Sequence, residues 1–315
     1  MEIIASSVAD AVRKVARSVL DNGEVVPRVV GQWTMHAENT TSNIREIHGL
    51  SVVVKDPMRR WTSLVNRGLV AETFDFLLGD NPGFIQDVWP FYRDWQTRGD
   101  RYPYVYGARI HGTDEQVDQW GQAVRTLRRD KTSRHACITI RRPQDIVEDY
   151  QPCSVAFQAQ INAEGKLDFF YQMRSNDCGA PGGFARNLFM CMHVFEQLSL
   201  ATGIPMGSYY HYATNMHIYE KDLKKAETMI SEVQEYDLGE PSTALLFTPR
   251  QMSYTREIFI QALRANDFGN IDSERDLMSK LNDNPYYQNL VRFVIRSDER
   301  RINLNELLWL REFDR

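Results

Sequence analysis

Cys153 has the most reactive side chain among the candidate site residues, and it follows Pro152 at the start of an alternating, strand-like run. A single cysteine in such a run usually serves as a small buried hydrophobic residue. It becomes a nucleophile only where a neighbouring cation lowers the pKa of the thiol. The chain has 4 cysteines, with no CxxC pair and no metal-ligand spacing to histidine. A structural cysteine and a thiolate nucleophile are therefore both open, whereas a metal site is not predicted.

A candidate oxyanion site lies at Arg174 and Ser175, where a predicted strand gives way to a glycine-rich loop over residues 178–183. A guanidinium fork and a hydroxyl group together suit an oxyanion such as phosphate. A strand-end turn with solvated charges explains the same residues about equally well. The glycines fit neither the GxGxxG nor the Walker pattern, so a nucleotide loop of those kinds is not predicted.

Glu72, His217 and Tyr219 each allow a functional and a structural interpretation. Glu72 falls within an apolar helical pattern over residues 61–78, and periodicity alone favours a place on the solvated face. His217 and Tyr219 alternate along a predicted strand and should share one face. There they could hydrogen-bond a sugar hydroxyl or form a structural pair.

The hydrophobic pattern predicts an α+β fold that positions these residues. Helices are predicted over residues 7–21, 61–78, 114–129 and 186–201. Strands are predicted over residues 44–54, 136–140, 154–161, 167–173 and 207–219. We expect residues 1–240 to form one domain with a central mixed sheet and flanking helices. Residues 241–315 should form a helical extension packed on the same domain.

Composition limits the class of protein and of partner. The 315 residues are 43% hydrophobic and 25% charged, which is typical of a soluble globular chain. The net charge of −5 argues against a general nucleic-acid binder, which would carry a strong basic excess. No apolar run reaches about 18 residues, so no membrane span is predicted. The N-terminal segment lacks the features of a signal peptide, and a cytoplasmic location with reduced thiols is expected.

Taken in chain order, four stretches resemble the thymidylate synthase superfamily, which includes the pyrimidine nucleotide hydroxymethylases. The stretches are Glu72-x-x-x-Phe76-Leu77-x-Gly79-Asp80; Val105-Tyr106-Gly107 with Ser133-Arg134; Gln151-Pro152-Cys153 with Gln158, Gly165-Lys166-Leu167, Tyr171-Gln172 and Arg174-Ser175-x-Asp177; and Asn187 with His217-Ile218-Tyr219. The third stretch is the most specific, and the match covers about residues 40–220. The resemblance implies a thymidylate synthase-like fold.

The resemblance implies catalytic roles for Cys153, Tyr106 and Glu72. The Cys153 thiolate adds to C6 of a pyrimidine ring, which makes C5 a nucleophile toward the one-carbon unit of 5,10-methylenetetrahydrofolate. Tyr106 matches the position that helps remove the C5 proton, and Glu72 matches the position that orders water near C4. In a hydroxymethylase this water attacks the exocyclic methylene, whereas in a synthase the folate reduces it by hydride transfer.

The resemblance also implies how the substrate, a pyrimidine nucleoside monophosphate, is held. Arg174 and Ser175 match phosphate ligands, and Gln158 belongs to the same substrate-binding set. Arg134 matches a phosphate arginine lent by the other subunit of a homodimer. His135 stands where the family has a second arginine, which reduces the positive charge.

Further positions bind sugar, base and folate in the resemblance. His217 and Tyr219 match the pair that holds the 3′-hydroxyl. Asn187 matches the base-reading position and favours uracil, because an amide can both donate and accept whereas a carboxylate only accepts. Asp177 matches a carboxylate that binds the pterin, and it is also assigned a catalytic role. Tyr92 replaces a tryptophan near the folate.

Two departures from the family concern phosphate binding and the choice between hydroxymethylation and reduction. The N-terminal phosphate arginine is replaced by Asn39 or a neighbour, for which Arg28 or Arg45 could compensate. The sequence ends in Glu312-Phe313-Asp314-Arg315 without the short apolar tail of the synthases. A site that admits water should trap the methylene as hydroxymethyl. The alternatives are reductive methylation of dUMP and a nucleotide-binding homologue without turnover.

Overall fold

The structure is a computed structural model of the 315-residue chain. It describes residues 1–30, 40–65, 69, 72–73, 76, 106–112, 117–147, 151–179 and 183–235. The helical extension expected over residues 241–315 lies outside these ranges. The boundary expected at residue 240 also lies outside them, so both stay predictions.

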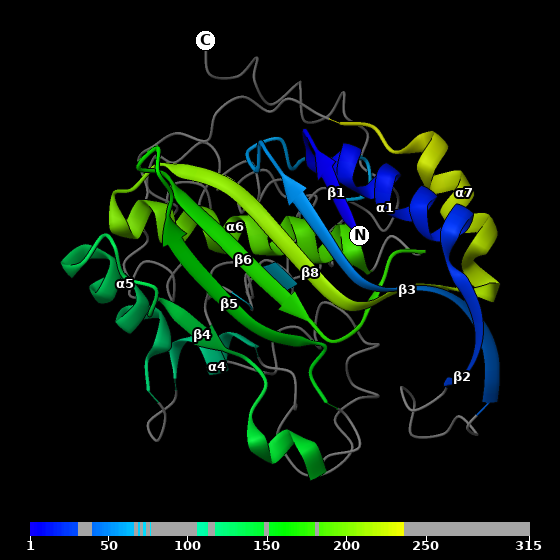
Figure 1. Ribbon diagram of the computed structural model, residues 1–315, viewed down its shortest axis with the longest axis horizontal. Helices are drawn as coiled ribbons and strands as arrows, with labels where there is room; N and C mark the ends of the chain where they lie inside the picture. The colour runs from blue at the N-terminus through cyan, green and yellow to red at the C-terminus, as the bar shows by residue number, and fades with distance from the viewer. Residues whose placement is uncertain are drawn as a thin grey trace, which may run out of the picture.

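A mixed sheet of eight strands forms the centre of the described part (Figure 1). Its strands are β1 (Glu2–Ala5), β2 (Glu24–Val30), β3 (Thr40–Val54), β4 (Cys137–Thr139), β5 (Ser154–Ile161), β6 (Leu167–Met173), β7 (Asn176–Asp177) and β8 (Met206–Tyr219). They are ordered β1-β3-β8-β6-β5-β4, with β2 paired to β3 and β7 paired to β8. β3 and β5 each run antiparallel to a neighbour, whereas β6 and β7 run parallel to β8. This mixed sheet with flanking helices confirms the predicted α+β class.

The described helices and short 3-10 segments lie behind the sheet and at its two sides (Figure 1). They are α1 (Val8–Asn22), α4 (Tyr106–His111), α5 (Gln119–Arg129), η2 (Pro143–Val147), α6 (Phe184–Thr202), η3 (Glu220–Asp222) and α7 (Leu223–Glu232). The helix predicted over residues 7–21 is α1, and the helix predicted over residues 186–201 is α6. Ser7 caps α1 by accepting a hydrogen bond from the backbone N–H of Asp10 at 3.3 Å.

The main core lies between α6 and one face of the sheet. α6 is apolar on nearly every side, which is typical of a buried helix. Phe195 of α6 stacks on Phe169 of β6 with ring centroids 5.2 Å apart. Phe157 of β5 lies next to Phe169 at 5.4 Å. Each such ring contributes roughly 1.5–3 kcal/mol by burial, so this layer fixes the positions of the strand ends that carry the site.

The opposite face of the central strands has no described helix over it. In Figure 1, β5, β6 and β8 lie in front of α6, and no described helix covers them from the viewer's side. Phe170 of β6 stacks on Tyr210 of β8 there at 4.6 Å. Tyr212 is 42% exposed on the same strand. A sheet face with exposed aromatic side chains is available for contact with another surface.

Two predicted helices begin later than the sequence pattern indicates. Residues 61–65 are not helical, because Thr62 forms a β-bridge with Glu235 and Ser63 donates its backbone N–H to the carbonyl of Gln234 at 3.0 Å. The helix predicted from residue 114 starts at Gln119 in the described part. Asp118 caps it by accepting from the backbone N–H of Gly121 at 2.8 Å. The predicted strands over residues 154–161 and 167–173 are confirmed with the same bounds.

Candidate active site

Cys153 lies directly before β5, at the end of the segment Gln151-Pro152. Its carbonyl accepts a hydrogen bond from the backbone N–H of Arg174 at 2.9 Å, so the entry to β5 and the exit of β6 lie side by side. Burial raises the pKa of the Cys153 thiol, and the positive charge of Arg174 opposes that shift only in part. The thiol therefore needs a proton acceptor before it can act as a nucleophile.

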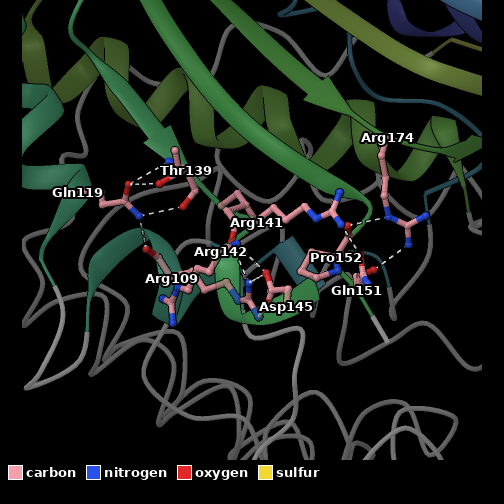
Figure 2. Close-up of polar contacts among 10 residues, drawn as sticks. Arg109, Gln119, Thr139, Arg141, Arg142, Asp145, Gln151, Pro152 and Arg174 are labelled. Carbon is pink, nitrogen blue, oxygen red and sulfur yellow. Dashed lines mark hydrogen bonds and ion pairs between the residues drawn. The ribbon is translucent and has the colours of Figure 1, made fainter. Parts of the chain in front are cut away.

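Two arginines approach the segment before Cys153 from different directions (Figure 2). Arg174 donates from Nε to the carbonyl of Pro152 at 3.0 Å and from Nη2 to the carbonyl of Gln151 at 2.8 Å. Arg141 donates from Nη2 to the side-chain oxygen of Gln151. A guanidinium has five N–H donors. Both arginines therefore keep donors with which to bind an oxyanion beside the thiol.

A buried ion pair holds α4 against the sheet near this segment (Figure 2). Arg109 pairs with both carboxylate oxygens of Asp145, at 2.6 and 2.8 Å, and donates to the carbonyl of Ile140 at 2.8 Å. Gln119 donates to the carbonyls of Arg109 and Thr139, at 2.7 and 2.9 Å. Removal of one partner from such a pair typically costs about 3–5 kcal/mol. The pair thus fixes the helix that carries the predicted proton-transfer residue.

Tyr106, the first residue of α4, begins a chain of uncharged polar groups behind Cys153. Tyr106 forms a hydrogen bond with Ser154, and the Ser154 hydroxyl shares a hydrogen bond with the hydroxyl of Tyr171. Cys191 forms hydrogen bonds with both Tyr171 and Tyr209. The Tyr209 hydroxyl in turn shares a hydrogen bond with Nδ1 of His211. We call this chain the neutral network; its members are Tyr106, Ser154, Tyr171, Cys191, Tyr209 and His211.

Burial sets the protonation state of Tyr106. It raises the pKa of the phenol well above its ordinary value, and the neighbouring Cys153 raises it further. The hydroxyl group of Tyr106 is therefore protonated near neutral pH. It can orient a water molecule or donate a hydrogen bond, but it does not act as a phenolate base.

Asp177 and His217 are paired across β7 and β8. The backbone N–H of Cys178 donates to the carbonyl of His217 at 2.8 Å, and the backbone N–H of Gly179 donates to Oδ1 of Asp177 at 2.8 Å. Burial raises the pKa of Asp177 to about 7, and Asp222 adds to the effect, whereas Gly179 opposes it. A carboxyl group that titrates near neutrality in a partly buried place is typical of functional sites.

His217 and Tyr219 share one face of β8, which confirms the predicted alternation. Their rings meet edge to face, with centroids 5.0 Å apart. Burial lowers the pKa of His217 to about 4 and raises that of Tyr219 to about 12, so both are neutral near pH 7. Asp177 and Cys153 also raise the pKa of the Tyr219 hydroxyl, so both lie near it. These four side chains therefore lie near one another and form the candidate site.

Glu72 is not on a solvated face, so that alternative is wrong. Its carboxylate pairs with Nε of Arg186 at 2.6 Å, and its side chain is 18% exposed. Arg186 lies in the first turn of α6, one residue before Asn187, whose Nδ2 donates to Sδ of Met173 at 3.4 Å. Periodicity within residues 61–78 could not reveal this partner, because it comes from a helix more than a hundred residues away.

Arg134, His135 and Gln158 are not brought to the cluster within one chain. Arg134 and His135 are exposed, and Gln158 donates to the carbonyl of Arg134 at 3.1 Å. Gln158 lies five residues beyond Cys153 along β5, which is about 16 Å at 3.3 Å per residue. If Arg134 contacts a substrate phosphate, it must therefore do so at the site of another subunit.

The remaining predicted positions fall in three places. Ser175 lies partly buried between Arg174 and β7. Arg45 donates to the carbonyl of Leu20 at 3.2 Å, and Arg28 pairs with Glu46, so both are engaged away from Cys153. Tyr92 and Asn39 lie outside the described residues.

Asn215, Arg141 and Arg186 were not among the predicted site residues. Asn215 accepts a hydrogen bond from Nδ1 of His217 at 2.8 Å. It precedes His217 by two residues, so the period of the strand already places both on one face. No comparable signal marks Arg141 or Arg186, whose partners are distant in sequence.

Among the helices of the described part, none has both the length and the apolar character that crossing a membrane requires.

Comparison with known proteins gives one family. A family model described as thymidylate synthase matches residues 55–285. The deoxyuridylate hydroxymethyltransferase of Bacillus phage SP01 is 27% identical over 293 residues, which cover 84% of this chain and 76% of that protein. A Methanothermobacter thermautotrophicus protein with the provisional name thymidylate synthase is 25% identical over 237 residues, which cover 71% of this chain and 96% of that protein.

Proposed function

The chain belongs to the thymidylate synthase family of one-carbon transferases, and on this premise we propose that it hydroxymethylates C5 of a pyrimidine nucleoside 5′-monophosphate. The convergence of the Cys153 thiol, the Arg174 guanidinium and the Asp177–His217 pair carries the proposal. The phage hydroxymethyltransferase, which aligns with 84% of this chain, supports the hydroxymethyl product. That relative is named for deoxyuridylate, and Asn187 at the start of α6 also supports uracil as the base.

The reaction begins at the thiol. Arg174 and Ser175 hold the phosphate and so place the base over Cys153. The sulfur of Cys153 forms a bond to C6, its proton passes to a base or solvent, and the electron pair of the C5–C6 double bond moves onto C5 and O4. C5 would then form a bond to the one-carbon unit of the folate. The protonated Tyr106 hydroxyl positions the water that removes the C5 proton, and the electron pair of that C–H bond would form the exocyclic C5=CH2 double bond as the folate nitrogen leaves. Sulfur leaves C6 when the ring regains its double bond.

The Asp177 carboxyl fits the 5,10-methylenetetrahydrofolate that enzymes of this family use. When bound, that cosubstrate supplies the one-carbon unit. Burial raises the pKa of Asp177 to about 7, so this carboxyl group can accept or donate a hydrogen bond near neutral pH. It would hold the N–H groups of the pterin ring, next to the strand that carries His217.

Glu72 positions the water that supplies the hydroxyl group of the product. Arg186 holds the Glu72 carboxylate at 2.6 Å in a partly buried place. That carboxylate orients a water molecule, whose oxygen adds to the methylene carbon on C5 while its proton passes to Glu72. The electron pair of the exocyclic double bond moves back onto C5 and O4, and it restores the C5–C6 double bond when the Cys153 sulfur leaves C6. The product is then heavier than the substrate by one formaldehyde unit.

A homodimer completes the site in this proposal. The sheet face with Phe170, Tyr210 and Tyr212, over which none of the described helices lies, offers an apolar surface for a second copy, and Arg134 is too far along the sheet to serve its own Cys153. Mixing a Cys153→Ala chain with an Arg134→Ala chain should restore activity to about a quarter of the wild type, because half of the random dimers hold one intact site. Recovery no greater than the sum of the two variants alone would contradict the shared arginine.

Reductive methylation of dUMP is the second candidate, because the archaeal relative carries a synthase name and aligns over 71% of this chain. Reduction would oxidise the folate to dihydrofolate, which is detected by its absorbance. Hydroxymethylation leaves the oxidation state of the folate unchanged.

The deciding experiment is mass spectrometry of a competition mixture. The purified protein is given dUMP, dCMP, UMP and CMP together with methylenetetrahydrofolate. We expect dUMP to gain the mass of formaldehyde. A gain of one methylene unit would identify a synthase instead, and four unchanged nucleotides would overturn the proposed activity on these substrates.

A further inference from the structure

A buried carboxylate on β3 lies beside His217 and Tyr219, the two residues proposed to hold the sugar. The side chain of Glu46 is 1% exposed. It accepts hydrogen bonds from Nδ2 of Asn215 at 2.8 Å, from Nε2 of His48 at 2.8 Å and from Nε of Arg28 at 3.2 Å. Asn215 in turn contacts His217. We call these five residues the ionised network.

The charge on Glu46 fixes the direction of the hydrogen bonds. Burial alone would raise the pKa of Glu46, but the hydrogen bonds from Arg28, Asn215 and His48 outweigh it and hold the pKa at about 2. An ionised carboxylate only accepts hydrogen bonds. The Asn215 amide must therefore turn its NH2 group toward Glu46 and its oxygen toward His217.

The orientation of Asn215 in turn fixes the proton on His217. The amide oxygen lies 2.8 Å from Nδ1 of His217, so Nδ1 carries the proton and donates it. Burial keeps this ring neutral, with a pKa of about 4. Nε2 is then an unprotonated acceptor. Within the described part of the chain, the side-chain hydrogen bond of His217 is the one made by Nδ1.

We propose that Glu46 and Asn215 are positioning residues that hold His217 in the Nδ1–H tautomer, so that Nε2 accepts a hydrogen bond from a substrate hydroxyl. The inference rests on the proposed function for the identity of that hydroxyl, which belongs to the sugar. An acceptor at this point selects a free hydroxyl. It disfavours a sugar that lacks the hydroxyl, and it repels a phosphate oxygen in the same place.

The tautomer is measured directly by ¹⁵N NMR of the full-length protein labelled at histidine. We expect the wild type to show a protonated Nδ1 and an unprotonated Nε2 for His217. Asn215→Leu removes the amide oxygen, and Glu46→Gln lets the Asn215 amide turn over. Both variants should give a mixture of tautomers. His48→Gln is the matched control, because it removes another partner of Glu46 and should leave the His217 signals unchanged.

The consequence for binding is measured with dUMP and its 2′,3′-dideoxy analogue. The wild type should bind dUMP about tenfold more tightly than the dideoxy analogue, as expected for one hydrogen bond. In Asn215→Leu the ratio of the two dissociation constants should be close to one. A wild-type His217 with a protonated Nε2, or unchanged tautomers in both Asn215→Leu and Glu46→Gln, would overturn the inference. The expected tautomers without any nucleotide binding would overturn the proposed function and leave the positioning role intact.

Discussion

One face of β8 carries two histidines in contrasting surroundings. His211 lies toward the start of the strand, with ring centroids 5.3 Å from Tyr171 and 5.0 Å from Phe184 of α6. Its Nδ1 shares a hydrogen bond with the Tyr209 hydroxyl at 3.1 Å. Six residues further along, His217 belongs to the ionised network and reaches the candidate site. The same residue type on the same face thus lies in the buried core in one half of the strand and at the candidate site in the other.

The difference between the two networks teaches what each can contribute. In the neutral network, burial raises the pKa values of Tyr171, Tyr209 and Cys191, so no member carries a charge near pH 7. Hydrogen bonds stabilise such groups in a core, although Nε2 of His211 has no partner within the described part of the chain. In the ionised network, one full charge on Glu46 is buried and needs three donors. Burial of that charge costs more free energy than burial of neutral groups. In return, it fixes the direction of each hydrogen bond from Glu46 through Asn215 to His217.

The largest contrast is expected between two thiols, Cys153 at the site and Cys191 in the neutral network. Cys153→Ala should slow release of the C5 proton from the nucleotide by about four orders of magnitude or more, because it removes the nucleophile. Cys191→Ala should leave the rate per folded molecule nearly unchanged. Tritium release from C5-labelled nucleotide measures both, and the exposed Cys137→Ser is the matched control. Undiminished proton release from Cys153→Ala would contradict the adduct mechanism.

Matched substitutions should separate the two histidines. An asparagine amide can take the place of Nδ1, so His217→Asn keeps the contact to Asn215 and loses Nε2. It should raise the KM for the nucleotide about tenfold and change the free energy of unfolding by less than about 1 kcal/mol. His211→Asn leaves a cavity beside Tyr171 and should destabilise the protein by about 2–3 kcal/mol with little effect on KM. Urea unfolding and steady-state kinetics measure both quantities, and equal stability losses would remove the distinction.

The alternating pattern of the sequence predicted the strands that carry these networks, but it did not predict their contacts. β5 and β6 have the predicted bounds because alternation and the turn at Gly165, with φ of 76°, are local signals. The shared face of His217 and Tyr219 followed from the same period. Glu46 and Asn215, by contrast, are 169 residues apart. Only the pairing of β3 with β8 brings them together, and no local pattern states which strands pair.

The site shows the same limit. Cys153, Arg174 and Asp177 were selected from residue type and family resemblance, and the ends of β5, β6 and β7 place them together. The burial of Glu72 was not predicted, because its partner Arg186 belongs to α6. The resemblance placed Gln158 with the substrate, whereas within one chain it contacts Arg134 at the far part of β5.

Acid should act in opposite directions on the two parts of the molecule. The pKa of His211 falls to about 3 on folding, so only the unfolded chain binds that proton between about pH 3 and 6.5, and stability is lost as the pH falls. The pKa of Asp177 rises to about 7, so the folded chain binds that proton between about pH 4 and 7, and stability is lost as the pH rises. Each contribution has a limiting slope of about 1.4 kcal/mol per pH unit.

Two variants isolate these slopes. Relative to the wild type, His211→Phe should become more stable as the pH falls from 6.5 to 4. Asp177→Asn should become more stable as the pH rises from 4 to 7. Urea unfolding at a series of pH values gives both differences. Parallel pH profiles for the wild type and either variant would show that the group in question does not titrate as described.

The smallest effect is expected at the outer end of the ionised network. The Arg28 side chain is 48% exposed, whereas the Glu46 carboxylate that it contacts is buried. Arg28→Met keeps most of the apolar stem and removes the two N–H donors that the guanidinium directs to Glu46, but Asn215 and His48 still hold the carboxylate. Water screens the exposed Arg28 charge, so we expect only a small loss of stability and unchanged His217 tautomers. Glu46→Gln, which acts at the centre, should change the tautomers. If Arg28→Met alters the His217 tautomers as strongly as Glu46→Gln does, the charge on Glu46 depends on its exposed partner Arg28. The expectation that Asn215 and His48 are sufficient would then be wrong.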